Sequence, residues 1–196
     1  SSPTTNQLND VYALSATDAW AVGSTGTIIH TTDGTNWNIV ATAGLTVSLY
    51  AVQAQGSTVW IGGGADNVAC TIRYTLDGGT TWNTPATNPS LDMCTDLSFV
   101  DNMTGFASLD GGGGTRPIMF TTDGGANWTL STTVNYGAYP YSRFDIEGIR
   151  AVSASTIIAT GWGSFVGGQP TVILVSTDGG VNFNAPDPTY AWATYG

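Results

Sequence analysis

The sequence predicts an all-β protein built from four repeats of four short strands. Three observations support this fold class. A Thr/Ser-x-Asp-Gly segment recurs four times, short runs rich in Val, Ile and aromatic residues precede each copy, and no useful length of chain has a 3.6-residue apolar period. The four aspartates lie 44, 46 and 55 residues apart, and periods of this size are typical of stacked or circular arrays of small units.

Each repeat is expected to contain its strands in the same order. Apolar runs predict the first strands at residues 11–14, 49–52, 97–100 and 149–152. Similar runs predict the second strands at 19–23, 59–62, 105–108 and 157–160. The third strands are expected at 27–30, 71–74, 117–120 and 172–175. Each of these runs leads into an Asp-Gly turn, which suits a hairpin into a fourth strand.

The repeats fill the chain as one domain, residues 1–196. Their bounds are expected near 8–45, 46–92, 93–144 and 145–190. Residues 189–196 read as one further strand. That strand could complete the first repeat, or it could pair with a neighbouring subunit, because an open sheet edge is a template for assembly.

Four strands per repeat are the unit of a β-propeller blade. The four turn segments resemble the Asp-box, or bacterial neuraminidase repeat, of the form Ser/Thr-x-Asp-x-Gly-x-x-Trp/Phe. Residues 18–23 and their surroundings are similar to Asp-box propellers related to photosystem II assembly factors and the sortilin ectodomain. The resemblance implies a propeller of four blades, either closed as a small ring or open and completed by a neighbouring chain. It implies little about function, because one fold carries many functions.

The motif residues are expected to be structural. A turn aspartate accepts hydrogen bonds from nearby backbone N–H groups, and glycine supplies the positive φ that the turn needs. The aromatic residue that closes the motif is expected to fold back into the core. These aspartate and aromatic pairs are Asp33 with Trp37, Asp77 with Trp82, Asp123 with Trp128 and Asp178 with Phe183. The first copy is one residue shorter, so its turn should differ.

Charge excludes several partners. The chain has 4 arginines, no lysine and 14 acidic residues, for a net charge of −10. Nucleic-acid binding depends on clustered basic residues, so no nucleic-acid partner is expected. No apolar run approaches the roughly 20 residues of a membrane helix, so no membrane insertion is expected.

Metal and cofactor sites are not expected. The only histidine, His30, and two cysteines do not build a zinc site. A calcium site between Asp92 and Asp101 stays open as an alternative, because carboxylates suit hard cations. Cys70 and Cys94 are predicted to form a disulfide, since the low-charge composition favours a secreted or cell-surface protein. The alternative is two reduced cysteines that act as small buried apolar residues.

Alignment of the repeats classifies two further residues. His30 occupies the position of Tyr74, Phe120 and Val175, which favours a packing role. Arg73 stands where the other repeats have apolar side chains. It is expected to extend along a blade edge or to point into a channel.

The ligand site is expected in loops that differ between repeats, because binding residues concentrate on variable loops. Aromatic side chains with polar tips suit sugars or a protein partner. The predicted ligand-binding residues are Tyr136, Tyr139, Tyr141, Arg143, Trp162, Phe165, Arg116 and Asp66, and Asp110 is a further candidate hydrogen-bonding residue. Ordinary loop packing is the alternative.

Catalysis is not expected. The Asp-box resemblance includes sialidases, which need an arginine triad and a Tyr/Glu nucleophile pair. This chain has four scattered arginines and a single glutamate, Glu147, and no spacing singles out a pair of carboxylates for glycoside hydrolysis. The sequence predicts an extracellular, non-catalytic binding module for a glycan or a protein. The alternative is a structural surface or fibre subunit that self-assembles, with a homo-oligomer formed through the terminal strand.

Overall fold

The computed structural model describes residues 2–41, 44–65, 70–89, 92–111, 117–135, 143–164 and 171–186. These residues form sixteen strands and one short 3₁₀ turn, η1 (Ser24–Gly26). Within the same ranges, no helix has the length and apolar character needed to cross a membrane. The all-β prediction is confirmed.

The strands follow one another in four antiparallel units, named here units 1 to 4. Unit 1 contains β1 (Leu8–Ala13), β2 (Ala19–Gly23), β3 (Ile28–Thr31) and β4 (Asn38–Ile39). Unit 2 contains β5 (Ser48–Gln55), β6 (Thr58–Gly64) and β7 (Thr71–Thr75). Unit 3 contains β8 (Met93–Phe99), β9 (Gly105–Gly111), β10 (Ile118–Thr121) and β11 (Thr129–Leu130). Unit 4 contains β13 (Arg143–Ala151), β14 (Ile157–Ser164), β15 (Thr171–Ser176) and β16 (Asn182–Asn184).

Two details depart from a simple four-strand repeat. In unit 2, the place of the fourth strand is taken by an isolated bridge between Tyr74 and Asn83. The segment after unit 3 forms β12 (Thr133–Asn135), which pairs in parallel with β16 of unit 4. Units 3 and 4 are therefore tied together at their outer strands by β12.

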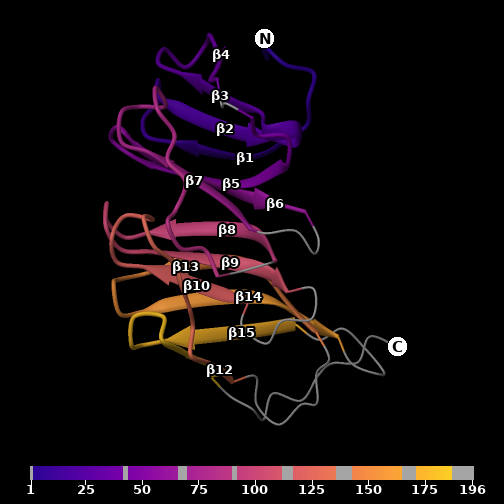
Figure 1. Ribbon diagram of the computed structural model, residues 1–196, viewed down its shortest axis with the longest axis vertical. Helices are drawn as coiled ribbons and strands as arrows, with labels where there is room; N and C mark the ends of the chain where they lie inside the picture. Colours follow the sequence, from indigo (N-terminus) through magenta and orange to yellow (C-terminus); the bar gives the residue numbers. More distant parts are fainter. Residues whose placement is uncertain are drawn as a thin grey trace.

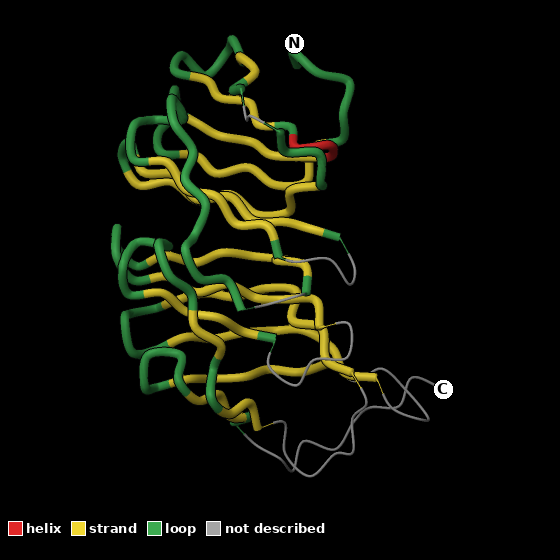
Figure 2. The backbone as a smooth tube through the Cα atoms, in the orientation of Figure 1, coloured by secondary structure: helices red, strands yellow, loops and turns green. Residues whose placement is uncertain are grey.

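The units are stacked along the longest axis of the molecule (Figure 1). Unit 1 lies at one end of this axis and unit 4 at the other, and the strands run across it (Figure 2). The first strands β1, β5, β8 and β13 contact one another in succession. Each inner unit therefore has a neighbour on both of its faces.

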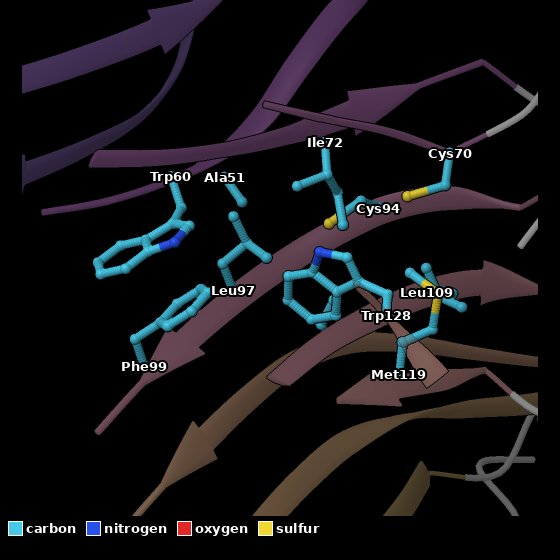
Figure 3. Close-up of a cluster of buried hydrophobic side chains, with 11 residues drawn as sticks. Ala51, Trp60, Cys70, Ile72, Cys94, Leu97, Phe99, Leu109, Met119 and Trp128 are labelled. Carbon is cyan, nitrogen blue, oxygen red and sulfur yellow. The ribbon is translucent and has the colours of Figure 1, made fainter. Parts of the chain in front are cut away.

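Three apolar cores fill the three spaces between consecutive units. Side chains alternate between the two faces of a strand, so a strand in an inner unit needs apolar residues on both sides. The core between units 1 and 2 contains Trp20, Val22, Ile28, Leu49, Val52, Ala54, Val59 and Ile61. The middle core, shown in Figure 3, includes Ala51, Trp60, Ile72, Leu97, Phe99, Leu109, Met119 and Trp128. The third core includes Phe106, Ile118, Ile146, Ile149, Ile157, Leu174 and Phe183.

One contact between units recurs three times. An aromatic side chain on the second strand of a unit packs against the second glycine of the next unit's Asp-Gly-Gly turn. A Cβ added to Gly79 would lie 2.8 Å from Trp20, and one added to Gly180 would lie 2.7 Å from Phe106. The third case is Trp60, which packs on Gly125 and whose indole N–H donates to the carbonyl of Gly124 at 2.8 Å. These glycines are required both by the close approach and by a positive φ.

The predicted disulfide is wrong. Cys70 and Cys94 are free and are 4% and 0% exposed within the middle core (Figure 3). The Cys94 thiol donates to the carbonyl of Asp96 at 3.6 Å. Its hydrogen bond with Cys70, together with burial, raises the pKa of Cys94 well above its usual value. This environment therefore favours the thiol form of Cys94 over the reactive thiolate. The two cysteines instead match the alternative given by the sequence, that they are reduced and act as small buried apolar residues.

Candidate functional site

The Asp-box aspartates are occupied by their own turns. The Asp123 carboxylate accepts the hydroxyl of Thr121 at 2.9 Å and the backbone N–H of Asn127 at 2.9 Å. The same threonine hydroxyl accepts the N–H of Gly125 at 3.0 Å. Turns with the same set of bonds surround Asp77 and Asp178. These carboxylates stabilise their own turns through local hydrogen bonds.

The first copy of the turn differs, as its shorter sequence predicts. Asp33 accepts the N–H groups of both Thr35 and Asn36, at 2.8 and 2.7 Å. Gly34 is the only residue of this turn with a positive φ, whereas each of the other turns has two consecutive glycines in that region. One residue fewer leaves room for only one left-handed position.

Hydrogen bonding also favours the ionised form of the turn aspartates. The backbone N–H and the hydroxyl of Thr81, with the hydroxyl of Thr75, lower the pKa of Asp77 to about 2. The side-chain amide of Asn36 is the largest of the causes that lower the pKa of Asp33. A carboxylate held ionised in this way is a poor general acid at neutral pH.

The closing aromatic residues are placed in the core to different degrees. Trp128 and Phe183 are 2% and 0% exposed, and Trp37 and Trp82 are half-buried. Trp82 packs at the edge of the core between units 1 and 2. Trp82, Trp128 and Phe183 therefore pack in or against the cores, whereas Trp37 lines a groove at the surface of unit 1.

His30 and Arg73 also have local roles. The His30 ring is stacked on Trp20 with 3.9 Å between the ring centroids, and its Nε2 lies 2.9 Å from a carboxylate oxygen of Asp18. The Arg73 guanidinium donates to the carbonyl of Ile72 at 2.8 Å, and burial lowers its pKa. Both side chains are half-buried.

A different set of residues meets at one end of the sheet formed by units 3 and 4. There β9 pairs with β13 through Asp110 and Asp145, and β13 pairs with β14 through Asp145 and Trp162. Gly111 lies opposite Phe144 in the same ladder. These strand ends, together with the neighbouring Glu147, are called here the loop rim. It is the place where three of the variable loops begin or end.

The loop rim combines one aromatic side chain with three carboxylates. The indole N–H of Trp162 donates to Glu147 at 3.3 Å; Trp162 is half-buried and Glu147 is exposed. Asp110 is half-buried, and Asp145 is 0% exposed. A flat apolar face beside an exposed acceptor, here Trp162 beside Glu147, can stack on a ring or a peptide plane and accept its hydrogen bonds.

The predicted site residues divide into three groups. Trp162 lies on the loop rim, and the backbone of Arg143 begins β13 there, opposite Ser164. Tyr136, Tyr139, Tyr141, Phe165, Arg116 and Asp66 lie outside the described residues. The segments that contain all of these except Asp66 connect directly to rim strands, whereas the segment with Asp66 follows β6 of unit 2.

Sequence reasoning missed the contribution of Glu147 and Asp145. Glu147 sits at a β-bulge, where the register of β13 on β14 shifts between Ile146 and Gly148. Bulges re-aim side chains near the ends of sheets. Glu147 is the only glutamate of the chain, which the sequence shows. The bulge that turns it toward Trp162 could not be predicted from the sequence.

Acidic residues on the first strands tie units together. Asp10 accepts the N–H of Val52 at 2.8 Å, and Asp96 accepts the N–H of Ile149 at 2.9 Å. Burial raises the pKa of both carboxyls, and nearby Arg150 opposes the rise. Across the described ranges, no three His, Cys, Asp or Glu residues are grouped to hold a metal, and this search included the segment from Asp92 to Asp101.

Comparison with known proteins identifies the fold. No protein-family model matches the chain, and no curated protein matches it. Solved structures do match. YCF48 bound to a D1 peptide is 16% identical, over 93% of this chain and 81% of that chain, with a TM-score of 0.54. YCF48 from Cyanidioschyzon merolae is 20% identical over 95% and 58%, with a TM-score of 0.61. An ancestral GH74 enzyme is 13% identical over 93% and 26%, with a TM-score of 0.65.

These matches define how far the resemblance extends. The chain spans 58% and 26% of the second and third of those structures, so it corresponds to part of larger propellers. A match at such low identity concerns the fold alone. The chain has a fold similar to the Asp-box-type propellers YCF48 and GH74, which confirms the predicted resemblance at this level.

Proposed function

We propose that this chain is a non-catalytic binding module that takes a glycan or a protein at the loop rim. In this proposal the four units are Asp-box blades of an open propeller on a secreted or cell-surface protein. The observation that carries it is the convergence of β9, β13 and β14. Their paired ends bring Trp162, Glu147 and the attachment points of three variable loops to one place.

The chemistry of the rim supports binding. Loops held on a rigid sheet are the usual location of binding residues. The half-buried Trp162 offers an apolar surface without the entropy cost of a flexible side chain, and its N–H is oriented by Glu147. The exposed Glu147 adds an acceptor for a hydroxyl or amide group.

The facing carboxylates of the rim, Asp110 and Asp145, are not arranged for glycoside hydrolysis. Two accessible carboxyl groups must flank the bond that is cut. Asp110 and Asp145 face each other on neighbouring strands, but Asp145 is 0% exposed and so is withheld from a substrate. The Asp-box carboxylates are engaged by their own turns.

Structures with the same fold provide precedents for both ligand classes. YCF48 has been solved with a D1 peptide, and other matches include a GH74 xyloglucanase from Xanthomonas campestris. These properties belong to those proteins. They support the choice of peptides and xyloglucan as the first ligands to test.

A glycan array and a peptide array, followed by calorimetry on each hit, test the proposal. Trp162→Ala is expected to lower the affinity at least about tenfold, as for a central aromatic contact, and Trp162→Phe to lower it less. Leu76→Ala, at a 60% exposed residue of the unit 2 turn, is the control and should bind as the wild type does. Unchanged binding by Trp162→Ala would place the site elsewhere.

A further inference from the structure

Among the residues that the structure describes, the two ends of the stack each present a sheet face that no other unit covers. In Figure 1, unit 1 and unit 4 are at opposite ends, whereas units 2 and 3 are covered on both sides. We call these the outer faces: the face of unit 4 that points away from unit 3, and the face of unit 1 that points away from unit 2. Each can be compared with the equivalent buried faces between units.

The outer face of unit 4 carries the residues that form cores elsewhere. On the third strand, Ile28, Ile72 and Ile118 are each 0% exposed between units, but the equivalent Ile173 is 52% exposed. On the second strand the equivalent of the buried aromatic residues is Ile158. It is 40% exposed, against 1% or less for Trp20, Trp60 and Phe106.

On the outer face of unit 1 the first strand is open, whereas Ala21 and Ile29 of the second and third strands are 4% and 2% exposed. On the first strand, Val52, Leu97 and Ile149 are 4%, 3% and 2% exposed, but the equivalent Val11 is 62% exposed. Val11 lies in an open groove of about 490 Å³. Its apolar lining is completed by Leu8, Ala21, Ile29 and Trp37.

Polar groups follow the same equivalence only in part. Between units 2 and 3, the Gln53 side chain donates to the carbonyl of Phe99 at 2.9 Å. In unit 4 the position of Gln53 is held by Arg150, which is exposed and is also a donor. In unit 1 the position of Phe99 is held by Ala13, whose backbone is at the exposed end of β1. Arg150 has no acceptor for the N–H that Gln53 receives from Phe99. It already lies near Asp10 and Asp96 of its own chain, so the correspondence between the two ends is in their apolar residues.

We propose that a second copy of this chain docks head to tail, with the outer face of unit 4 in one copy against the outer face of unit 1 in the next. The contact would continue the packing that already joins the units three times within the chain. Because the two faces differ, the association is heterologous and grows into a closed ring or a filament. It uses sheet faces, and it needs no strand exchange.

The charge of the chain sets the conditions for this association. A net charge of −10 on each copy is repulsive, and salt screens charges separated by more than about 8 Å at physiological ionic strength. The buried contact itself is apolar. The association is therefore expected to strengthen as sodium chloride is raised.

Sedimentation velocity over a range of protein concentrations tests the proposal. The wild type is expected to form species larger than a monomer, and more of them at higher salt. Val11→Glu blocks only the outer face of unit 1, and Ile173→Glu blocks only that of unit 4. Each variant alone is expected to be a monomer, with association weakened at least about tenfold, because a charge is placed in an apolar contact. An equal mixture of the two is expected to give dimers and nothing larger, since one free face of each kind remains.

Matched controls separate this result from general effects of charge or folding. Leu76→Glu adds the same charge at a 60% exposed apolar residue away from both outer faces, and it should assemble as the wild type does. Circular dichroism confirms that each variant is folded. A wild type that stays monomeric at every salt and protein concentration overturns the proposal. Dimers of Val11→Glu alone also overturn it, because they would show contact between like faces.

Discussion

At the scale of single residues, the hydroxyl of the Asp-box is buried more deeply than the aspartate that names the motif. Thr121 is 2% exposed and Thr75 is 0% exposed, while the Asp77 and Asp123 side chains reach toward solvent. The threonine hydroxyl receives a glycine N–H and donates to the carboxylate. The hydroxyl therefore connects the turn to the strand, and the carboxylate closes the turn from outside.

Replacing this hydroxyl is expected to destabilise the fold. Thr121→Val keeps the shape but leaves the buried N–H of Gly125 without its acceptor, which costs about 1–3 kcal/mol. Thr122→Val, at the exposed neighbouring residue, is the control and should change stability by less than about 0.5 kcal/mol. Urea unfolding followed by circular dichroism measures both. Equal effects at the two sites would contradict the role given to the Thr121 hydroxyl.

Asp77 predicts a pH dependence with a definite sign. Its pKa in the fold is about 2, below the value of roughly 3.9 of an unfolded aspartate. Its contribution to stability is therefore complete above about pH 4 and is lost as the pH falls toward 2. Asp77→Asn keeps an acceptor oxygen but does not titrate, so its urea midpoint should fall less than that of the wild type between pH 5 and 2.

Asp10 provides a comparison of opposite sign. Burial raises its pKa, so the folded wild type loses stability as the pH rises from about 4 through the folded pKa. Relative to the wild type, Asp10→Asn should gain stability over that rise. The same sign for both variants would show that general charge, and not these local contacts, controls the pH dependence.

The two cysteines give a simple test at the same scale. Both are expected to react with a thiol reagent only after unfolding, because they are 4% and 0% exposed. In denatured protein prepared without reductant, two thiols per chain should react with the reagent. No reaction after denaturation would show the disulfide that the sequence suggested and that the structure lacks.

At the scale of elements, the joints between units are of two kinds. Units 1 and 2, and units 3 and 4, are joined by an aspartate that accepts a backbone N–H, through Asp10 and Asp96. Units 2 and 3 have Ala51 at that position and use Gln53 instead, which bonds both the N–H and the carbonyl of Phe99 at 2.5 and 2.9 Å. Among the hydrogen bonds between the first strands of these two units, Gln53 is therefore the buried amide that serves both backbone groups of Phe99.

Gln53→Met is expected to weaken the middle joint. Methionine has a similar length, but it leaves the N–H of Phe99 and part of its carbonyl without partners, at a cost of about 1–3 kcal/mol. In a chain of this size each kcal/mol lowers the melting temperature by roughly 2–4 °C. Gln55→Met should have a smaller effect, because Gln55 is at 3.3 Å from a carbonyl that Gln53 still holds. An equal loss from both would contradict this assignment.

The elements also show what the sequence could predict. Strands and Asp-Gly turns were predictable, because period-two apolar runs and a repeated glycine each have a local physical cause. The reduced fourth strand of unit 2 and the parallel pairing of β12 were not, because they depend on contacts with the next unit. The disulfide prediction failed for the same reason: sequence separation does not tell whether two buried thiols meet in bonding geometry. Of the predicted site, Trp162 could be placed, but its partner Glu147 depended on a bulge.

At the scale of the whole molecule, stability is a sum over neighbours. Each apolar core joins two consecutive units, so inner units take part in two cores and end units in one. β6 of unit 2 is buried along its whole length, whereas β15 of unit 4 alternates buried and exposed residues. Because the end units have fewer buried contacts, their strands should unfold locally more often than those of the inner units.

Hydrogen exchange followed by mass spectrometry measures that opening. In dilute protein, amides of β6 and β9 are expected to exchange slowest, because opening them breaks two cores, whereas β15 should exchange faster. Raising the protein concentration should then slow exchange in β15 and β1 together, because head-to-tail docking covers both outer faces at once. Ile173→Glu should remove this concentration dependence at both ends while leaving β6 unchanged. Equal protection of β15 and β6 in the dilute monomer would contradict the linear stack, since it would require a second interface on unit 4.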